Sequence, residues 1–224
     1  MQSWNGTGSL LITCIEFILL INIFIFAEKN KNNYLVMGMI SLLMIYQAME
    51  YFMCGLGYDS HYSAFLAFTD ISFLPPLGLY FVLSFYNYKS KYLYLVFLPA
   101  IAFIFYYSTI INQFDVNACT VFYAIYKYPH GDLYGFFYYV PILITMYFLY
   151  RGMRKSGNKK RVQISKILLT AYILISLPVV ISFLLAFAGE MTLVHSIVSV
   201  MCKFAVILAV ALTYFALTNK KSNG

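Results

Sequence analysis

The sequence predicts an all-α, polytopic integral membrane protein of seven transmembrane helices, with the N-terminus outside and the C-terminus in the cytoplasm. The composition, the long apolar runs and the positions of the basic residues lead to this fold class. The chain is 62% hydrophobic and 10% charged, whereas a soluble domain carries about 25% charged residues. The net charge of +7 therefore indicates membrane topology, and we expect a lipid bilayer and no nucleic acid as a partner.

Long apolar runs occur along the whole chain. A helix that crosses a bilayer needs about 20 mostly apolar residues. The runs that we expect to span are residues 10–27, 34–57, 62–86, 92–108, 135–150, 162–188 and 191–218. Their apolar residues are continuous rather than alternating, which is typical of helices and not of barrel strands. We expect residues 1–224 to form one transmembrane domain without a soluble domain.

Polar or turn-forming residues separate most of these runs. All side chains of residues 28–33 are charged or carry an amide group. Residues 59–61, 87–91 and 189–190 also break the apolar pattern. The longest connection, residues 110–134, is rich in aromatic side chains. It is predicted either to lie in the aromatic belt at the membrane interface or to form a lid over a ligand site.

The basic residues predict the orientation. Six of the fifteen Lys and Arg residues lie between the fifth and sixth runs: Arg151, Arg154, Lys155, Lys159, Lys160 and Arg161. Pairs of lysines follow the first, third and seventh runs, whereas the other loops contain only Lys127. Because basic loops stay on the cytoplasmic side, an odd number of spans with an outside N-terminus fits this pattern. The basic loop is also a candidate binding surface for a cytoplasmic partner.

Polar side chains inside the spans predict a binding pocket. Charged groups in a span are rare and are usually functional. With a rise of about 1.5 Å per residue, the intramembrane ionisable groups apart from Lys166 fall in the outer half of the bilayer or near its midplane. Together with neighbours on the same helix faces, the candidate pocket consists of Glu16, Gln47, Glu50, Asp70, His195, Ser199 and Lys203.

This pocket is expected to open outward and to take a small ligand or a cation. Glu50, Asp70 and Lys203 are expected to form one interacting set, because a lysine near the midplane needs a counter-charge. Three carboxylates face one lysine, so a proton, a charged His195 or a bound cation would balance the charge. The alternative is that each group is satisfied by a neighbouring helix and has only a structural role.

Two further features surround the candidate pocket. Pro75 and Pro76 free backbone carbonyls next to Asp70, which predicts either a cation or polar-ligand site or an ordinary proline kink. Cys54 and Cys119 both fall on the outer side, where an oxidising environment permits a disulfide. Whether they form this bridge or remain as two thiols is left open by the sequence.

The sequence gives little support for an enzyme. It contains no HExxH, GxSxG, P-loop or GxGxxG motif, so we expect no catalytic residues, metal or cofactor. A membrane-embedded hydrolase that uses His61, Asp70 and His195 remains an alternative.

Two stretches resemble parts of a known sensor family. Residues 77–86 (LGLYFVLSFY) and 161–166 (RVQISK) look like the seven-helix, N-out sensor module that precedes histidine-kinase and cyclase domains in many prokaryotic proteins. The resemblance implies a sensor or receptor. No output domain follows in this sequence, so signalling would require a separate partner.

A second set of residues is similar to microbial rhodopsins. Residues 70–77 (DISFLPPL), Pro178 and Lys203 resemble the counterion stretch, the helix-six proline and the retinal lysine of that family. This resemblance implies a Schiff base on Lys203 with Asp70 as counterion. The sequence departs from the family because its one tryptophan is Trp4 and because Ser199 stands where an acidic partner is usual.

The preferred interpretation is a sensor- or receptor-like protein of the plasma membrane. A small transporter or cation-binding permease is the alternative.

Overall fold

The computed structural model describes the backbone of residues 5–88, 93–121, 124–187 and 191–219, and their side chains except at residues 132, 183, 184, 186, 187 and 191–202. Its elements in chain order are α1 (Thr7–Phe26), α2 (Lys31–Cys54), α3 (His61–Ser72), α4 (Leu74–Phe85), η1 (Leu93–Phe97), α5 (Leu98–Thr109), η2 (Ile111–Gln113), β1 (Asp115–Cys119), β2 (Ala124–Lys127), α6 (Gly131–Lys155), α7 (Lys159–Phe187) and α8 (Met191–Thr218).

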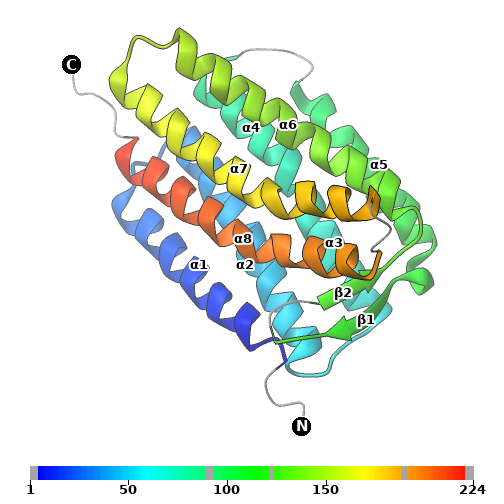
Figure 1. The fold of residues 1–224 in the computed structure, drawn as a ribbon. Helices are drawn as coiled ribbons and strands as arrows, with labels where there is room; N and C mark the ends of the chain where they lie inside the picture. Colours follow the sequence, from blue (N-terminus) through cyan, green and yellow to red (C-terminus); the bar gives the residue numbers. More distant parts are fainter. Residues whose placement is uncertain (1–4, 89–92, 122–123, 188–190, 220–224) are drawn as a thin grey trace.

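The long helices lie side by side in one bundle (Figure 1). The hairpin of β1 and β2 lies at one end of the bundle, close to the start of α1, and we call this the hairpin end. The connection between α6 and α7 and the end of α8 lie at the opposite end. We call this the basic end, because Arg151–Arg161 is located there.

Among the described residues, five helical segments are long and apolar enough to cross a membrane. They are Thr7–Phe26, Lys31–Cys54, His61–Phe85, Leu133–Lys155 and Lys159–Ser182. Leu93–Thr109 and Lys203–Thr218 are shorter apolar helices. Large apolar side chains such as Phe24 and Phe105 are exposed, as a lipid-facing surface would be. These findings support an integral membrane protein.

The predicted span of residues 62–86 consists of two helices that meet at Phe73. The amide of Phe73 donates to the carbonyl of Asp70 at 3.4 Å, and the amide of Leu77 donates to the carbonyl of Phe73 at 3.1 Å. Pro75 lies in the first turn of α4, where its missing N–H leaves no helical bond unmade. The two prolines therefore lie in the first turn of the second helix of this span.

The connection predicted as an aromatic loop contains a two-stranded antiparallel hairpin. Asp115 pairs with Lys127, and Cys119 pairs with Ala124, with an irregularity in register between Val116 and Ala118. The hairpin is the one departure from the all-α class within the described segments.

Several aromatic side chains of this connection are buried in a core of their own. Phe114 is fully buried and contacts the rings of Phe68, Tyr107 and Tyr128. Such ring contacts contribute beyond the area that they bury. These aromatic residues anchor the hairpin to α3 and α5.

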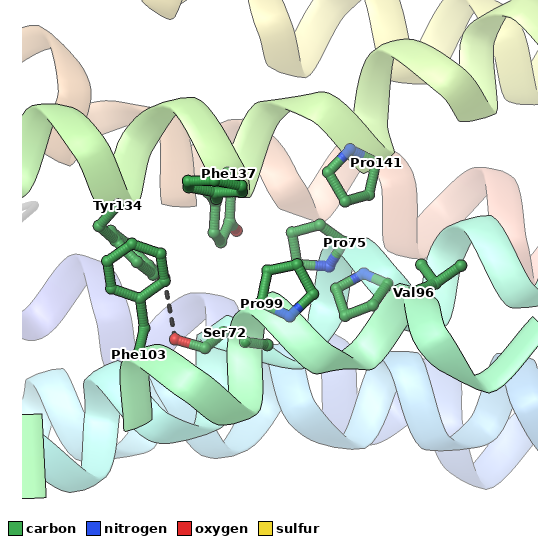
Figure 2. Close-up of a pocket in the computed structure, with 11 residues that line it drawn as sticks. Ser72, Pro75, Val96, Pro99, Phe103, Tyr134, Phe137 and Pro141 are labelled. Carbon is green, nitrogen blue, oxygen red and sulfur yellow. Dashed lines mark hydrogen bonds between the residues drawn. The ribbon is translucent and has the colours of Figure 1, made fainter. Parts of the chain in front are cut away.

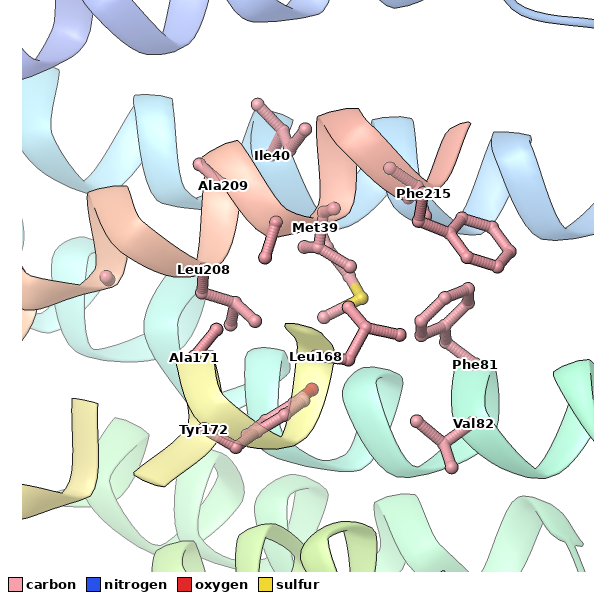
Figure 3. Packing of buried hydrophobic residues seen from close by; sticks show 14 of the residues in the cluster. Met39, Ile40, Phe81, Val82, Leu168, Ala171, Tyr172, Leu208, Ala209 and Phe215 are labelled. Atoms are coloured by element: carbon pink, nitrogen blue, oxygen red, sulfur yellow. The ribbon is translucent and has the colours of Figure 1, made fainter. Parts of the chain in front are cut away.

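The main hydrophobic core lies between α2, α4, α7 and α8 (Figure 3). Met39 and Ile40 of α2 lie next to Leu208 of α8, while the rings of Phe81 and Phe215 meet edge to face at 4.9 Å. Burying these side chains holds α8 against α2. This packing fixes the position from which Lys203 of α8 reaches its partners.

Candidate functional site: a buried ion pair beneath the hairpin

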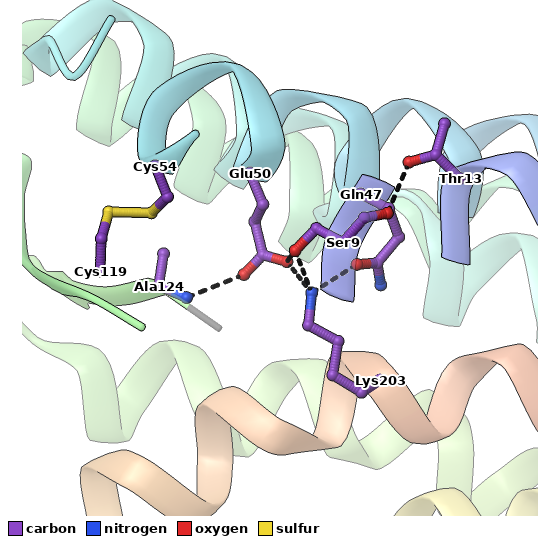
Figure 4. Close-up of polar contacts among 8 residues, drawn as sticks. All are labelled: Ser9, Thr13, Gln47, Glu50, Cys54, Cys119, Ala124 and Lys203. Carbon is purple, nitrogen blue, oxygen red and sulfur yellow. Dashed lines mark hydrogen bonds and ion pairs between the residues drawn. A yellow bond between two sulfur atoms is a disulfide. The ribbon is translucent and has the colours of Figure 1, made fainter. Parts of the chain in front are cut away.

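Lys203 of α8 is the centre of a polar cluster that joins three helices (Figure 4). Its ammonium forms an ion pair with Glu50 Oε2 and donates hydrogen bonds to Gln47 Oε1, both on α2. It also donates to Ser9 Oγ of α1 at 2.8 Å. An ammonium has three N–H donors, so these three acceptors match its capacity.

Helical spacing explains why the α2 partners lie together. Gln47 and Glu50 are three residues apart and therefore share one face of α2. Gln47 is fully buried, Glu50 is 1% exposed, and the side chain of Lys203 is 10% exposed. At this depth each charge depends on the other, because removing one partner would leave an uncompensated buried charge.

Glu50 also binds the hairpin. Its Oε1 accepts a hydrogen bond from the backbone N–H of Ala124, the first residue of β2, at 3.1 Å. Its Oε2 accepts from Ser9 Oγ at 3.2 Å in addition to pairing with Lys203. One carboxylate thus connects the hairpin with α1, α2 and α8.

Covalent and backbone bonds fix the hairpin over this cluster. Cys54 at the end of α2 forms a disulfide with Cys119 of β1, which answers the alternative that the sequence leaves open. The amides of Gly6 and Gly8 donate to the carbonyls of Thr120 and Val121 at 2.9 and 3.0 Å. Gly6 has a φ of 74°, which glycine adopts without strain. The hairpin therefore closes the ion pair off from the hairpin end of the bundle.

Glu16 of α1 is buried close to the same cluster. Its side chain is fully buried, and a negative charge on its carboxyl group would lie within electrostatic range of Lys203. Neither of its carboxylate oxygens has a hydrogen-bond partner among the described residues. The structure thus places two carboxyl groups near one lysine, and pairs only one of them with it.

Asp70 does not join this cluster, which corrects the expected set of Glu50, Asp70 and Lys203. Asp70 lies on α3, whose main contacts are with α2, α5 and β1. Its Oδ2 is buried, and no described residue donates to it. Among the described residues the ion pair of Lys203 is made with Glu50 and not with Asp70, so similar depth in the bilayer is not enough to pair two groups.

The remaining candidate pocket residues, His195 and Ser199, lie on the backbone of α8, but their side chains are outside the described residues.

Two cavities lie elsewhere in the bundle. One is lined by prolines and aromatic rings, including Pro75, Pro99, Phe103 and Pro141, with the Ser72–Tyr134 hydrogen bond at its edge (Figure 2). The other lies between α3, α4, α6, α7 and α8 and is mainly apolar. Neither is lined by Lys203 or Glu50.

The hydrolase alternative uses His61, Asp70 and His195, and the side chain of His195 lies outside the described residues. Among the residues with described side chains, no three His, Cys, Asp or Glu side chains are grouped to hold a metal. His61 Nδ1 lies in hydrogen-bond contact with the carbonyl oxygen of Phe114, so this histidine takes part in attaching α3 to the start of the hairpin.

The basic loop forms an exposed surface at the basic end. Its six basic side chains, Arg151, Arg154, Lys155, Lys159, Lys160 and Arg161, are all exposed. Two of them also lie over aromatic rings: Arg154 over Tyr150 at 4.7 Å, and Arg161 over Phe85 at 5.4 Å. The stretch can therefore meet an acidic surface without losing an internal ion pair among the described residues.

Sequence reasoning missed two groups of the site. Ser9 lies seven residues before Glu16, and this spacing places both on one face of a helix, so a search for polar residues in phase with Glu16 would have found it. The Ala124 amide is a backbone group, and its role depends on the hairpin, for which the sequence carries no comparable pattern.

No protein-family model, no curated protein and no solved structure matches this chain.

Proposed function

We propose that this chain is a seven-span receptor or sensor of the plasma membrane, with the hairpin end outside and the basic end in the cytoplasm. Five helical segments have the length and composition of spans, and Leu93–Thr109 and α8 would supply the other two. Lys29, Lys31 and the basic loop lie toward one end, and the positive-inside rule assigns that end to the cytoplasm. The resemblance to N-out sensor modules supports the same arrangement.

The observation that carries the receptor proposal is the dual bonding of Glu50. One carboxylate oxygen holds the hairpin through the Ala124 amide, and the other holds Lys203 of α8. A small ligand or cation that enters beneath the hairpin from outside would compete for this carboxylate. α8 would then lose its tie to α2, and the change would reach the opposite end of the same helix.

The exposed basic loop is the surface that we propose for a cytoplasmic partner or anionic lipid. Each basic residue near an anionic surface contributes about 1 kcal/mol, and six of them are exposed there. A conformational change of the helices that border this loop would alter how they present these charges.

The orientation has a direct test. Reporters that are active on only one side of a membrane should show the C-terminus and residues 156–158 in the cytoplasm, and the N-terminus outside. The reason is the one-sided distribution of basic residues. A cytoplasmic N-terminus would contradict the proposal, because the hairpin and the ion pair would then face the cell interior.

A small-cation panel tests the receptor function. Ammonium, methylamine, guanidinium, sodium and potassium are added to purified protein, and at least one should raise the unfolding temperature of the wild type but not of Glu50→Gln. The same cations should show no protein-dependent flux in proteoliposomes. If no cation stabilises the wild type, the proposed ligand class is wrong.

A cation-binding permease is the second candidate, and the unpartnered Glu16 favours it. A permease needs a charged group that exchanges partners inside the bilayer. Protein-dependent cation flux that is abolished by Glu16→Gln would establish this function in place of the receptor.

A further inference from the structure

Glu16 is the buried charged group that the ion pair of Glu50 and Lys203 does not satisfy. It is fully buried on α1, and both of its carboxylate oxygens lack a partner among the described residues. A lone carboxylate inside a bilayer is highly unfavourable. While Lys203 is paired with Glu50, Glu16 must therefore hold a proton and remain neutral.

Lys203 already touches the helix face that carries Glu16. Ser9, Thr13 and Glu16 have the spacing i, i+4 and i+7, so they lie along one face of α1. The ammonium of Lys203 donates to Ser9 on this face, and Glu16 lies within the range of its charge. A lysine side chain has a flexible four-carbon stem, so rotation of this stem moves the ammonium along the face toward Glu16.

The charged groups around Glu16 are few. α1 packs against α2 and α8, and the described charged side chains that those helices bring to the polar cluster are Glu50 and Lys203. Thr13 donates its hydroxyl to the Ser9 carbonyl at 2.9 Å. His195 and Cys202 are further titratable residues of α8, and their side chains lie outside the described residues. Two carboxyl groups thus compete for one ammonium.

We propose that Glu16 is a proton-binding site, and that the ammonium of Lys203 and one proton exchange places between Glu50 and Glu16. In the observed arrangement Glu50 is ionised and paired, while Glu16 is a neutral acid. When the ammonium moves to Glu16, the proton of Glu16 passes to Glu50. Lys203 then pairs with the ionised Glu16, and the neutral Glu50 acid donates to Ser9 Oγ and accepts from the Ala124 amide. The net charge of the three groups is zero in both arrangements.

This exchange makes the cluster a proton relay between two depths of the bundle. It requires only Glu16, Glu50 and Lys203, and it operates whether the chain signals or transports. In a receptor, this exchange would couple the release of Glu50 from Lys203 to the movement of a proton. In a permease, it would give Lys203 a second partner, Glu16, to alternate with Glu50.

Infrared spectroscopy of the purified protein in lipid nanodiscs tests the proton site at neutral pH. The wild type should show the carbonyl band of buried protonated carboxyl groups, and Glu16→Gln should lose the part of this band that Asp70→Asn leaves. Asp70→Asn is the matched control, because Asp70 is the other carboxyl with a buried, unpartnered oxygen. A band that survives in Glu16→Gln at unchanged intensity would overturn the proposal.

A double-mutant cycle tests the exchange of partners. Glu50→Gln should leave Lys203 to pair with Glu16, so this variant should lose most of the carbonyl band and only part of its thermal stability. Glu16→Gln alone should change the unfolding temperature little. The double variant leaves the ammonium without a carboxylate, so its loss should exceed the sum of the single losses. Additive losses would show that Lys203 does not reach Glu16, and would overturn the exchange.

Discussion

Replacing Lys203 by Met should destabilise the protein by about 3 kcal/mol or more, because it leaves Glu50 buried without its counter-charge. Met retains much of the length and apolar character of the lysine stem, so packing changes little. Glu50 keeps the Ala124 amide and the Ser9 hydroxyl as donors, but neither neutralises it. Unfolding in detergent micelles, followed by circular dichroism against temperature or denaturant, measures the loss.

The double variant Lys203→Met with Glu50→Gln should be more stable than Lys203→Met alone. With both charges absent, neither position carries a charge without its counter-ion, and uncharged residues of similar size fill the same space. Asp70→Asn is the control, because among the described residues Lys203 pairs with Glu50 and not with Asp70. Its effect should add to that of Lys203→Met. If Asp70→Asn instead rescued Lys203→Met, and Glu50→Gln did not, the observed pairing would be wrong.

The contacts that could be predicted from the sequence are those that follow helical spacing. Gln47 and Glu50 lie three apart on one span, and the structure brings both to Lys203. The helix that carries Lys203 runs over Met191–Thr218, the residues expected for the seventh run. Both results depend on local periodicity and on the long apolar sequence, which are properties of single helices.

The contacts that could not be predicted depend on how helices are arranged around one another. Asp70 has the depth expected for a partner of Lys203, but α3 lies against α2, α5 and β1. The hairpin arises in a segment whose aromatic residues suit a membrane interface equally well, and its burial depends on contacts with Phe68 and Tyr107. The Ala124 amide bonds Glu50 only because this hairpin forms.

Removing the Cys54–Cys119 disulfide should have the second-largest effect on stability. The bridge joins residues separated by 65 positions, and the entropy of closing such a loop is worth about 4 kcal/mol for a chain that unfolds completely in water. In a bilayer or micelle the helices between the two cysteines remain helical when the protein unfolds, so the unfolded state gains less freedom. We therefore expect a loss of about 2 kcal/mol for the variant in which both cysteines are replaced by Ala.

The matched control for this variant is Cys14→Ala. Cys14 is an exposed free cysteine on α1, so its replacement should leave the unfolding temperature almost unchanged. Equal losses in the two variants would mean that the bridge contributes nothing beyond the loss of a thiol side chain.

The disulfide variant also reports on the ion pair beneath the hairpin. The bridge fixes β1 to α2, and Ala124 of the adjacent strand bonds Glu50, so a released hairpin would admit water to the carboxylate. A solvated Glu50 depends less on Lys203, since the penalty for a lone charge falls as the charge regains water. Lys203→Met should therefore cost less stability in the disulfide-free protein than in the wild type. An unchanged cost would show that the hairpin does not shield the pair, and a ligand would then need no movement of the hairpin to reach Glu50.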